Sequence, residues 1–118
     1  MKLVIVSQVQ GRVPVTVLEL QGRVNLGNAM ELEQAALQAY NTGARDILID
    51  LSKAPSLTSA GIRSILTIHK LLTNTGMDKV NHLKLVSSSA YVRNVLEVAG
   101  LLDYIEVFTS LEEAIPSY

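Results

Sequence analysis

Cysteine is absent from the 118-residue sequence, and aromatic residues make up only 4% of it. Without cysteine the chain can form no disulfide, no thiolate nucleophile and no thiolate metal site. Hydrophobic residues nevertheless make up 48% of the chain, so we expect an aliphatic core built from Val, Ile, Leu and Ala. A chain of this length can bury such a core without a covalent or metal cross-link.

Blocks of like charge and long apolar runs are also missing. The chain has 10 basic and 11 acidic residues, and they are not gathered into the basic arm or patch that nucleic acid or an anionic membrane would attract. The apolar run at the N-terminus is shorter than that of a secretory signal. No stretch approaches the roughly 20 apolar residues of a membrane helix. The sequence therefore predicts a soluble, cytoplasmic protein with no nucleic-acid partner and no membrane insertion.

Runs typical of strands alternate with patterns typical of helices along the chain. The predicted strands cover residues 3–9, 13–20, 47–51, 83–86 and 105–108. The predicted helices cover residues 28–40, 59–73, 90–99 and 110–115. The first two strands form a hairpin, and the later alternation indicates parallel strands joined by right-handed crossovers. We therefore expect an α/β fold with a mixed, mostly parallel β-sheet and about four helices, in one domain over residues 1–118.

Single residues add detail to these elements. Pro14 indicates that its end of the second strand lies at an edge or an entry. Asn28 and Glu31 have the spacing of a capping box at the first helix. Gly100 stands where a left-handed C-cap of the third helix belongs. The third helix is predicted to bury a stripe of residues at helical spacing, namely Val92, Val95, Leu96 and Ala99.

Residues that could carry catalysis or bind a metal are scarce. Neither His69 nor His82 has a second histidine or a carboxylate at the helical spacing of metal ligands. A triad of His69, Ser59 and Asp50 can be drawn on paper, but no Gly-x-Ser-x-Gly turn supports it. The glycine motifs that cradle nucleotide phosphates are missing as well. We therefore expect no metal, no cofactor and no enzymatic activity.

Hydroxyl side chains precede two of the predicted helices. Residues 87–89 are all serine, and N-capping explains them. Thr58 and Ser59 differ, because they follow a buried strand at the carboxyl edge of a parallel sheet, where functional residues collect. A phosphate on a hydroxyl there would meet the free N–H groups and the positive dipole end of a helix. These two residues are our candidates for a regulatory site.

Four regions of the chain match the segments of one domain family in their order. Asp-Leu-Ser at residues 50–52 and Thr-Ser-Ala-Gly-Ile at 58–62 are similar to Asp-Leu-Ser followed by a loop that ends in Asp-Ser-Ser-Gly-Leu. Residues 20–25 resemble Leu-x-Gly-x-Leu-Asp, and residues 92–101 resemble Val-x-Arg-x-Leu-x-x-x-Gly-Leu. Residues 111–114 resemble the usual C-terminal helix. Together these segments resemble the STAS family of anti-sigma factor antagonists over nearly the whole chain.

The resemblance implies a STAS fold and a partner-switching role in transcription. Such domains bind an anti-sigma factor, often a serine kinase, and so free a sigma factor. The kinase phosphorylates the first serine of Asp-Ser-Ser-Gly, which breaks the complex, and a phosphatase restores it. That serine corresponds to Ser59, with Thr58 as the alternative acceptor; Thr58, Ala60 and Asn25 stand where the family has Asp, Ser and Asp. The partner-binding residues that the resemblance implies are Asn25, Thr58, Ser59, Ala60, Gly61 and Arg63.

Two other functions are compatible with these residues. The chain could be a STAS interaction subunit of a transporter or signalling scaffold that is not phosphorylated. It could also be a small enzyme or ligand-binding domain that uses the loop near Asn25 and Ser59. The lack of an acid–base cluster disfavours the enzyme.

Overall fold

A five-stranded sheet in the order β1-β2-β3-β4-β5 forms the centre of the computed structural model, which describes residues 3–22, 24–25, 27–54, 57–73, 82–103 and 105–118. The strands are β1 (Val4–Gln10), β2 (Pro14–Leu20), β3 (Ile47–Asp50), β4 (Leu83–Val86) and β5 (Glu106–Phe108). β1 and β2 are antiparallel, whereas every later pair of neighbours is parallel. The predicted mixed, mostly parallel sheet with a hairpin at its start is therefore confirmed.

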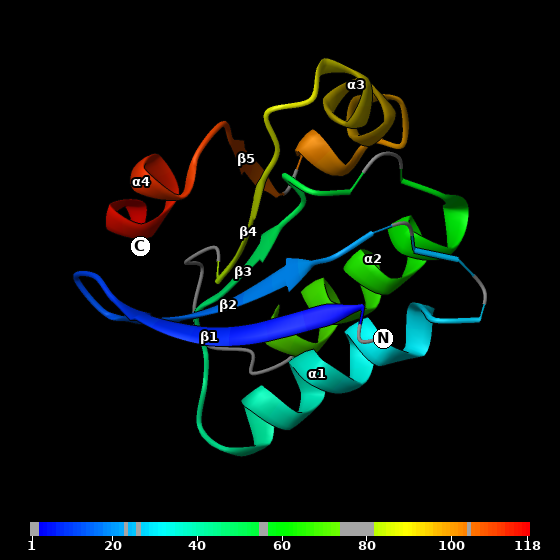
Figure 1. Ribbon diagram of the computed structural model, residues 1–118. Helices are drawn as coiled ribbons and strands as arrows, with labels where there is room; N and C mark the ends of the chain where they lie inside the picture. Colours follow the sequence, from blue (N-terminus) through cyan, green and yellow to red (C-terminus); the bar gives the residue numbers. More distant parts are fainter. Residues whose placement is uncertain (1–2, 23, 26, 55–56, 74–81, 104) are drawn as a thin grey trace.

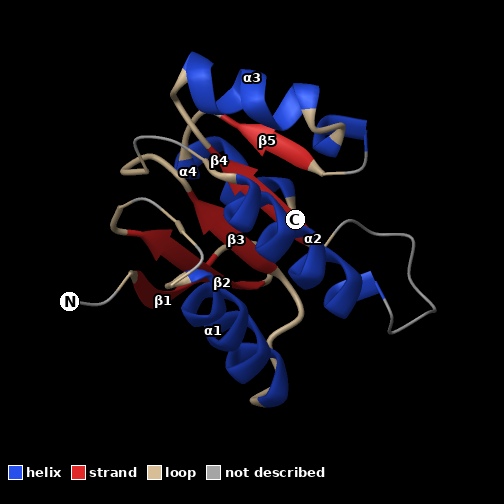
Figure 2. Cartoon of the chain, turned by 90° about the vertical axis from the view of Figure 1, so that its right-hand side faces the viewer, coloured by secondary structure: helices blue, strands red, loops and turns tan. Residues whose placement is uncertain are grey.

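The helices alternate with the parallel strands, as the sequence predicts. They are α1 (Ala29–Asn41), α2 (Ser59–Thr73), α3 (Ala90–Val98) and α4 (Leu111–Ala114), with short 3-10 turns η1 (Leu101–Asp103) and η2 (Ile115–Ser117). α1 and α2 lie side by side on one face of the sheet, and α4 lies on the other (Figure 1). Figure 2 shows α3 beside β5, at the edge of the sheet that is farther from β1. No helix among the described residues is long and apolar enough to cross a membrane.

The core has two parts because both faces of the sheet are covered. The larger part joins the sheet to α1, α2 and α3, and its fully buried side chains include Leu18, Leu20, Leu32, Ile49, Ile65, Leu85 and Leu96. The smaller part lies under α4 and contains Val15, Val17, Leu48, Val86 and Ala114. All four residues of β3 are buried, as expected of a central strand that is covered on both faces. The aliphatic core that the composition predicts is present.

Most of the predicted boundary residues have their expected roles. Pro14 is the first residue of β2 and lies opposite Gln10 of β1, a strand-start position at which a proline is tolerated. The Ser89 hydroxyl accepts a hydrogen bond from Val92 N at 3.2 Å and caps α3. Gly100 has a φ of 81°, the left-handed conformation that glycine adopts without strain. N-capping and a glycine stop therefore explain both ends of α3.

Two details of the helix predictions are wrong. Asn28 occupies the N-cap position of α1, but its side chain makes no capping bond to the helix. Its Oδ1 instead accepts a hydrogen bond from Asn25 N, while the Glu31 carboxylate accepts one from Val4 N at 2.9 Å. The capping box is therefore replaced by contacts to the preceding loop and to β1. Ala99 is exposed rather than buried, because α3 ends at Val98 and the chain turns toward Gly100.

A buried lysine is held on the α4 face of the sheet. The Lys84 ammonium group donates hydrogen bonds to Ser117 O and Ser117 Oγ, both at 2.9 Å, and lies 4.6 Å from the centre of the Tyr118 ring. The Tyr118 hydroxyl in turn donates to Ile47 O at 2.6 Å. These contacts fasten residues 117 and 118 over the sheet. Burial raises the pKa of the Tyr118 hydroxyl above its ordinary value, and the nearby Asp46 carboxylate adds to the rise.

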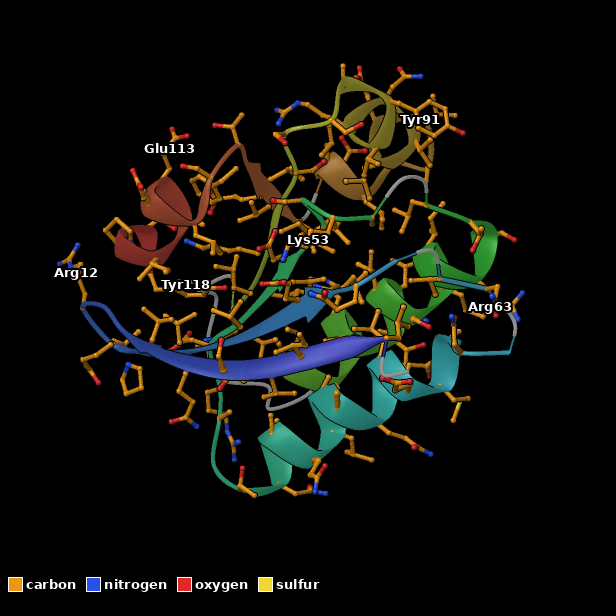
Figure 3. The ribbon with its side chains drawn as sticks, viewed as in Figure 1. Arg12, Lys53, Arg63, Tyr91, Glu113 and Tyr118 are labelled. Atoms are coloured by element: carbon orange, nitrogen blue, oxygen red, sulfur yellow. The ribbon has the colours of Figure 1, made fainter. Side chains whose placement is uncertain are left out.

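The raised pKa of Tyr118 predicts a loss of stability in alkali. The folded chain keeps the phenolic proton at a pH at which the unfolded chain has lost it. Stability is therefore complete below the unfolded pKa of about 10 and falls above it, by up to about 1.4 kcal/mol per pH unit. Urea denaturation of Tyr118→Phe across this range is expected to show a weaker pH dependence than the wild type. Tyr91→Phe is the control, because the Tyr91 side chain is exposed and points into solvent (Figure 3); equal slopes for all three proteins would contradict the prediction.

Candidate functional site

The predicted site residues lie together where β2 and β3 end. These strands are parallel neighbours, so the loops that follow them leave the same edge of the sheet. An isolated parallel bridge between Val24 and Leu57 joins the two loops beyond the strands. A shallow surface depression beside this bridge is lined by Asn25, Gly27, Thr58, Ser59 and Ala60. None of the described residues that line the depression carries a charge.

Thr58 ties the two loops together and caps α2. Its hydroxyl donates a hydrogen bond to Val24 O, which is 34 residues away in the sequence, and accepts one from Gly61 N at 3.3 Å. The Thr58 carbonyl also accepts from Ile62 N at 3.0 Å, the bond that opens the helix. The hydroxyl hydrogen and a lone pair of Thr58 are thus both committed to the fold.

Replacing Thr58 by Val should destabilise the domain while keeping the shape of the side chain. The substitution removes an N-cap and leaves Val24 O, on a fully buried residue, without its partner. We expect a loss of about 1–3 kcal/mol in the free energy of unfolding, measured by urea denaturation. Thr58→Ser keeps the hydroxyl and should lie close to the wild type. If the Val variant were as stable as the Ser variant, the bond to Val24 O would not contribute.

Ser59, by contrast, presents a free hydroxyl to solvent. It is the first residue of α2 and is exposed, and its side chain makes no hydrogen bond to another described residue. The next two residues are buried, since Ala60 is 7% exposed and Gly61 packs against the bridge below. A Cβ at Gly61 would lie 2.8 Å from Leu57 Cδ1 and 3.3 Å from Val24 Cβ, so glycine lets the start of α2 approach the bridge.

Arg63 is the charged residue of the predicted set. It lies four residues after Ser59 on α2, which places the two side chains on the same side of the helix one turn apart. It is exposed and extends into solvent at the edge of the molecule (Figure 3). A cation at this position can approach an anion carried by Ser59.

Asn25 shapes the loop between β2 and α1. Its Oδ1 accepts hydrogen bonds from Gly27 N at 2.8 Å and Asn28 N at 3.1 Å. The Asn28 side chain returns a bond, because its Oδ1 accepts from Asn25 N at 2.7 Å. A neutral amide oxygen at residue 25 is therefore sufficient to hold this loop beside Thr58 and Ser59.

A buried polar contact fixes α2 against α1 one turn below the site. The Ser64 side chain is fully buried, and its hydroxyl lies 2.8 Å from Glu33 Oε2 and 3.3 Å from Ala29 O. A buried hydroxyl must be satisfied in this way. The contact joins α2 to the first turns of α1, the helix that follows the loop at Asn25.

An ion pair lies at the same edge of the sheet, and it was not predicted. Lys53 Nζ is 3.0 Å from Glu19 Oε1, which joins the loop after β3 to the end of β2 (Figure 3). Hydrogen bonds from Lys53 and then from Gln21 lower the pKa of the Glu19 carboxyl. Asp50, which opens the predicted signature, is buried, and its Oδ1 accepts from Ser52 N at 2.9 Å. Asp50 therefore shapes the loop rather than facing a partner.

The two histidines do not extend the site. His82 Nδ1 lies 2.8 Å from Asp46 Oδ1, near the amino ends of the strands and away from Ser59. His69 lies inside α2, where burial lowers its pKa. Across the part of the chain that the structure describes, no three His, Asp or Glu side chains come close enough to hold a metal ion. The polar groups nearest to Ser59 are hydroxyl, amide and guanidinium groups, and the Lys53–Glu19 ion pair lies at the same end of the strands.

A comparison with family models adds the deciding observation. The model of the STAS domain matches residues 5–114. The chain belongs to the STAS domain family. This finding confirms the family that the four sequence segments resemble, and the match includes every residue of the depression beside Ser59.

Relatives of this STAS domain are described as anti-sigma factor antagonists. The protein BtrV of Bordetella bronchiseptica, named as a candidate anti-sigma factor antagonist, is 32% identical over 99 residues, or 84% of this chain and 82% of BtrV. An anti-sigma factor antagonist from Mycobacterium paratuberculosis has the same fold, with a TM-score of 0.79, 21% identity and coverage of 97% of this chain and 91% of that one. The unphosphorylated anti-sigma factor antagonist SpoIIAA is similar with a TM-score of 0.75 and 20% identity, over 95% of this chain and 92% of its own. The STAS fold is thus shown.

Proposed function

We propose that this STAS domain is a cytoplasmic anti-sigma factor antagonist whose whole length, residues 1–118, acts as one binding domain. It binds an anti-sigma factor of the serine-kinase class through the edge of the sheet that carries Ser59. Phosphorylation of Ser59 by that kinase releases the partner, and a phosphatase restores binding. The domain acts on transcription by contact and not by catalysis.

The observation that carries the proposal is the contrast between two neighbouring hydroxyl groups. Ser59 is exposed at the start of α2, whereas the hydroxyl of Thr58 is engaged with Val24 O and Gly61 N. A phosphate ester on Thr58 would have no hydroxyl hydrogen to donate to Val24 O. Phosphorylation of Ser59 breaks no such bond, so Ser59 is the acceptor we favour over Thr58.

The position of Ser59 also suits a reversible phosphate. The N–H groups at the very start of a helix have no partner within the helix and carry the positive end of its dipole. A phosphate adds roughly −1.5 to −2 charge at neutral pH, here beside a depression whose described lining residues are uncharged. The modification therefore changes the surface that a partner meets without a need to unfold the site.

The relatives support the choice of partner. BtrV, at 32% identity, carries a name of the same functional class. SpoIIAA, a Bacillus cell fate determinant, has been solved in an unphosphorylated and a phosphorylated form, and both are similar to this fold. An anti-sigma factor is accordingly the partner to look for.

The test is a pull-down of the tagged domain from its source cells, with mass spectrometry of the captured proteins and of the bait. We expect an anti-sigma factor with a kinase domain among the captured proteins and a phosphate on Ser59 in part of the bait. A Ser59→Asp bait run in parallel should lose that protein, which identifies specific capture. Capture of the same anti-sigma factor by both baits would contradict the phosphorylation switch, and failure to bind any anti-sigma factor would contradict the proposed function.

One feature favours a second function, an interaction subunit of a transporter or signalling scaffold without a phosphate switch. Asn25 and Thr58 are neutral where the resemblance implies aspartates, and their amide and hydroxyl groups are used to hold the loops. A kinase that reads a carboxylate beside its serine would find none among the described residues that line the depression. A bait that captures membrane or scaffold proteins and carries no phosphate on Ser59 would identify this function.

A further inference from the structure

The two edges of the sheet are protected to very different degrees. β5 is three residues long, includes the exposed Glu106, and has its Val107 carbonyl covered by the Arg93 guanidinium, whose NH1 donates at 3.4 Å. Short strands, charges and covering side chains are the ordinary means of preventing edge-to-edge pairing. β1, at the other edge, is seven residues long and contains neither a charged residue nor a proline. Its register with β2 is unbroken from Val4 to Gln10, so no bulge interrupts it.

The register identifies which backbone groups of β1 are open. In an antiparallel pair the residues of one strand alternate between those bonded to the neighbour and those that face away. Leu3 O accepts from Gln21 N at 2.7 Å, so the odd-numbered residues are bonded to β2 and the even-numbered ones face the edge. Val4 N faces the edge and is occupied by the Glu31 carboxylate at 2.9 Å. The open positions are therefore Val6, Gln8 and Gln10.

Apolar side chains are exposed along the same strand. Ile5 is 50% exposed and Val6 is 52% exposed, on opposite faces of the sheet. Val6 also lines a depression between β1 and α1, together with Val4, Glu31, Gln34, Ala35 and Gln38. An added strand would complete the ladder and at the same time cover this depression.

We propose that β1 is the interface between two copies of this chain, which pair antiparallel about a two-fold axis at Gln8. This register opposes Gln8 to Gln8 and Val6 to Gln10 of the other copy, so it uses all three open positions. The two sheets then form one continuous sheet, and the contact is isologous, as in most homodimers. The dimer leaves the surface around Ser59, at the carboxyl ends of β2 and β3, available to a partner. The proposal does not depend on the proposed function.

Charge favours a second copy in this register. β1 itself is neutral, so two copies approach without repulsion between their strands. The register brings Arg12 of each copy to the level of Val4 of the other, where the Glu31 carboxylate is bound. Arg12 is exposed at the tip of the β1–β2 hairpin, beyond the end of the strand (Figure 3). Because of the two-fold symmetry, the dimer contains two such pairs, each formed by Arg12 of one copy and Glu31 of the other.

The proposal is tested by the mass of the full chain in solution, measured by sedimentation over concentrations from about 1 μM to about 1 mM. The wild-type mass should rise from 12.8 kDa toward twice that value. Gln8→Lys and Gln8→Glu each place like charges opposite one another at the axis, so each should weaken self-association by about fivefold or more. An equal mixture of the two variants should restore the dimer, because opposite charges then meet. Asn94→Lys, on the exposed side of α3, makes a lysine substitution away from β1 and should leave the dimer unchanged.

Recovery of the dimer in the mixture also shows that the Gln8 variants fold. Loss of the dimer in a single variant would not show this, because an unfolded variant would lose the dimer as well. A wild-type chain that stays at 12.8 kDa at every concentration would overturn the proposal and leave the open edge to a strand of another protein. Gln8 variants that dimerise as the wild type does would overturn it as well, because the interface would then lie elsewhere.

Discussion

Leu96→Ala is expected to lower the free energy of unfolding by about 2–5 kcal/mol. The Leu96 side chain is fully buried in the larger part of the core, where it fastens α3 to the sheet. Truncation to Ala removes apolar surface and leaves a cavity that the surrounding strands cannot fill completely. Since a domain of this size is stable by only about 5–15 kcal/mol, the substitution should remove a large fraction of its stability.

Val98→Ala provides the matched control on the same helix. Val98 is 81% exposed, and its truncation should change stability by no more than about 0.5 kcal/mol. Urea denaturation of the two variants and the wild type measures both effects. If Leu96→Ala and Val98→Ala had the same small effect, α3 would have to present a different face to the sheet.

The order and type of the elements could be read from the sequence because local patterns determine them. The apolar run at 47–50 predicts a strand buried on both faces, and β3 is buried at every position. Gly100 and Ser89 mark the ends of α3 through their intrinsic conformational and capping preferences. These signals require no knowledge of what lies across the fold, and they predict most of the elements to within two residues.

Contacts between distant segments could not be predicted in the same way. Glu31 has the spacing of a capping residue, yet its carboxylate binds Val4 N, because that N–H group faces an open sheet edge. Lys84 occurs in an apolar run, and only the fold shows that Ser117 accepts hydrogen bonds from its ammonium group, which also lies 3.6 Å from Glu106 Oε1 on the neighbouring strand. In each case the partners lie more than 20 residues away in sequence, and spacing carries no information about them.

The candidate site falls between these two cases. A helix start after a buried strand predicts that Ser59 is exposed at the carboxyl edge of the sheet, and the structure confirms this position. The local sequence pattern offers both Thr58 and Ser59 as hydroxyl acceptors, and only the resemblance to the STAS family places Ser59 before Thr58. Their difference arises from Val24 O, which only the neighbouring loop brings to Thr58. The role of Ser59 as a phosphate acceptor stays a prediction.

Ser59→Asp is expected to weaken binding of the anti-sigma factor by roughly 30-fold or more. The substitution places a negative charge at the start of α2, next to a depression in which the lining residues that the structure describes are uncharged. A partner docked over that depression would bury the new charge without an opposite charge of its own to meet it, and such mismatched charges cost about 2–5 kcal/mol. The Arg63 guanidinium, one turn further along α2, is exposed and offsets this cost only in part. The free domain should not suffer, because acidic side chains are favourable at a helix N-terminus.

Affinity and stability must therefore be measured together on wild type, Ser59→Asp and Ser59→Ala. Titration with the captured partner should show a loss for Ser59→Asp alone, while thermal denaturation gives similar midpoints for all three proteins. Ser59→Ala separates the effect of charge from that of the lost hydroxyl, since the hydroxyl forms no hydrogen bond to a described residue in the free domain. Equal affinities would remove Ser59 as the switch. Thr58→Glu would then be the remaining test. Because this substitution also breaks the hydrogen bond to Val24 O, its affinity must be compared with that of Thr58→Val, which breaks the same bond without adding a charge. Only a larger loss of affinity for Thr58→Glu would assign the switch to Thr58.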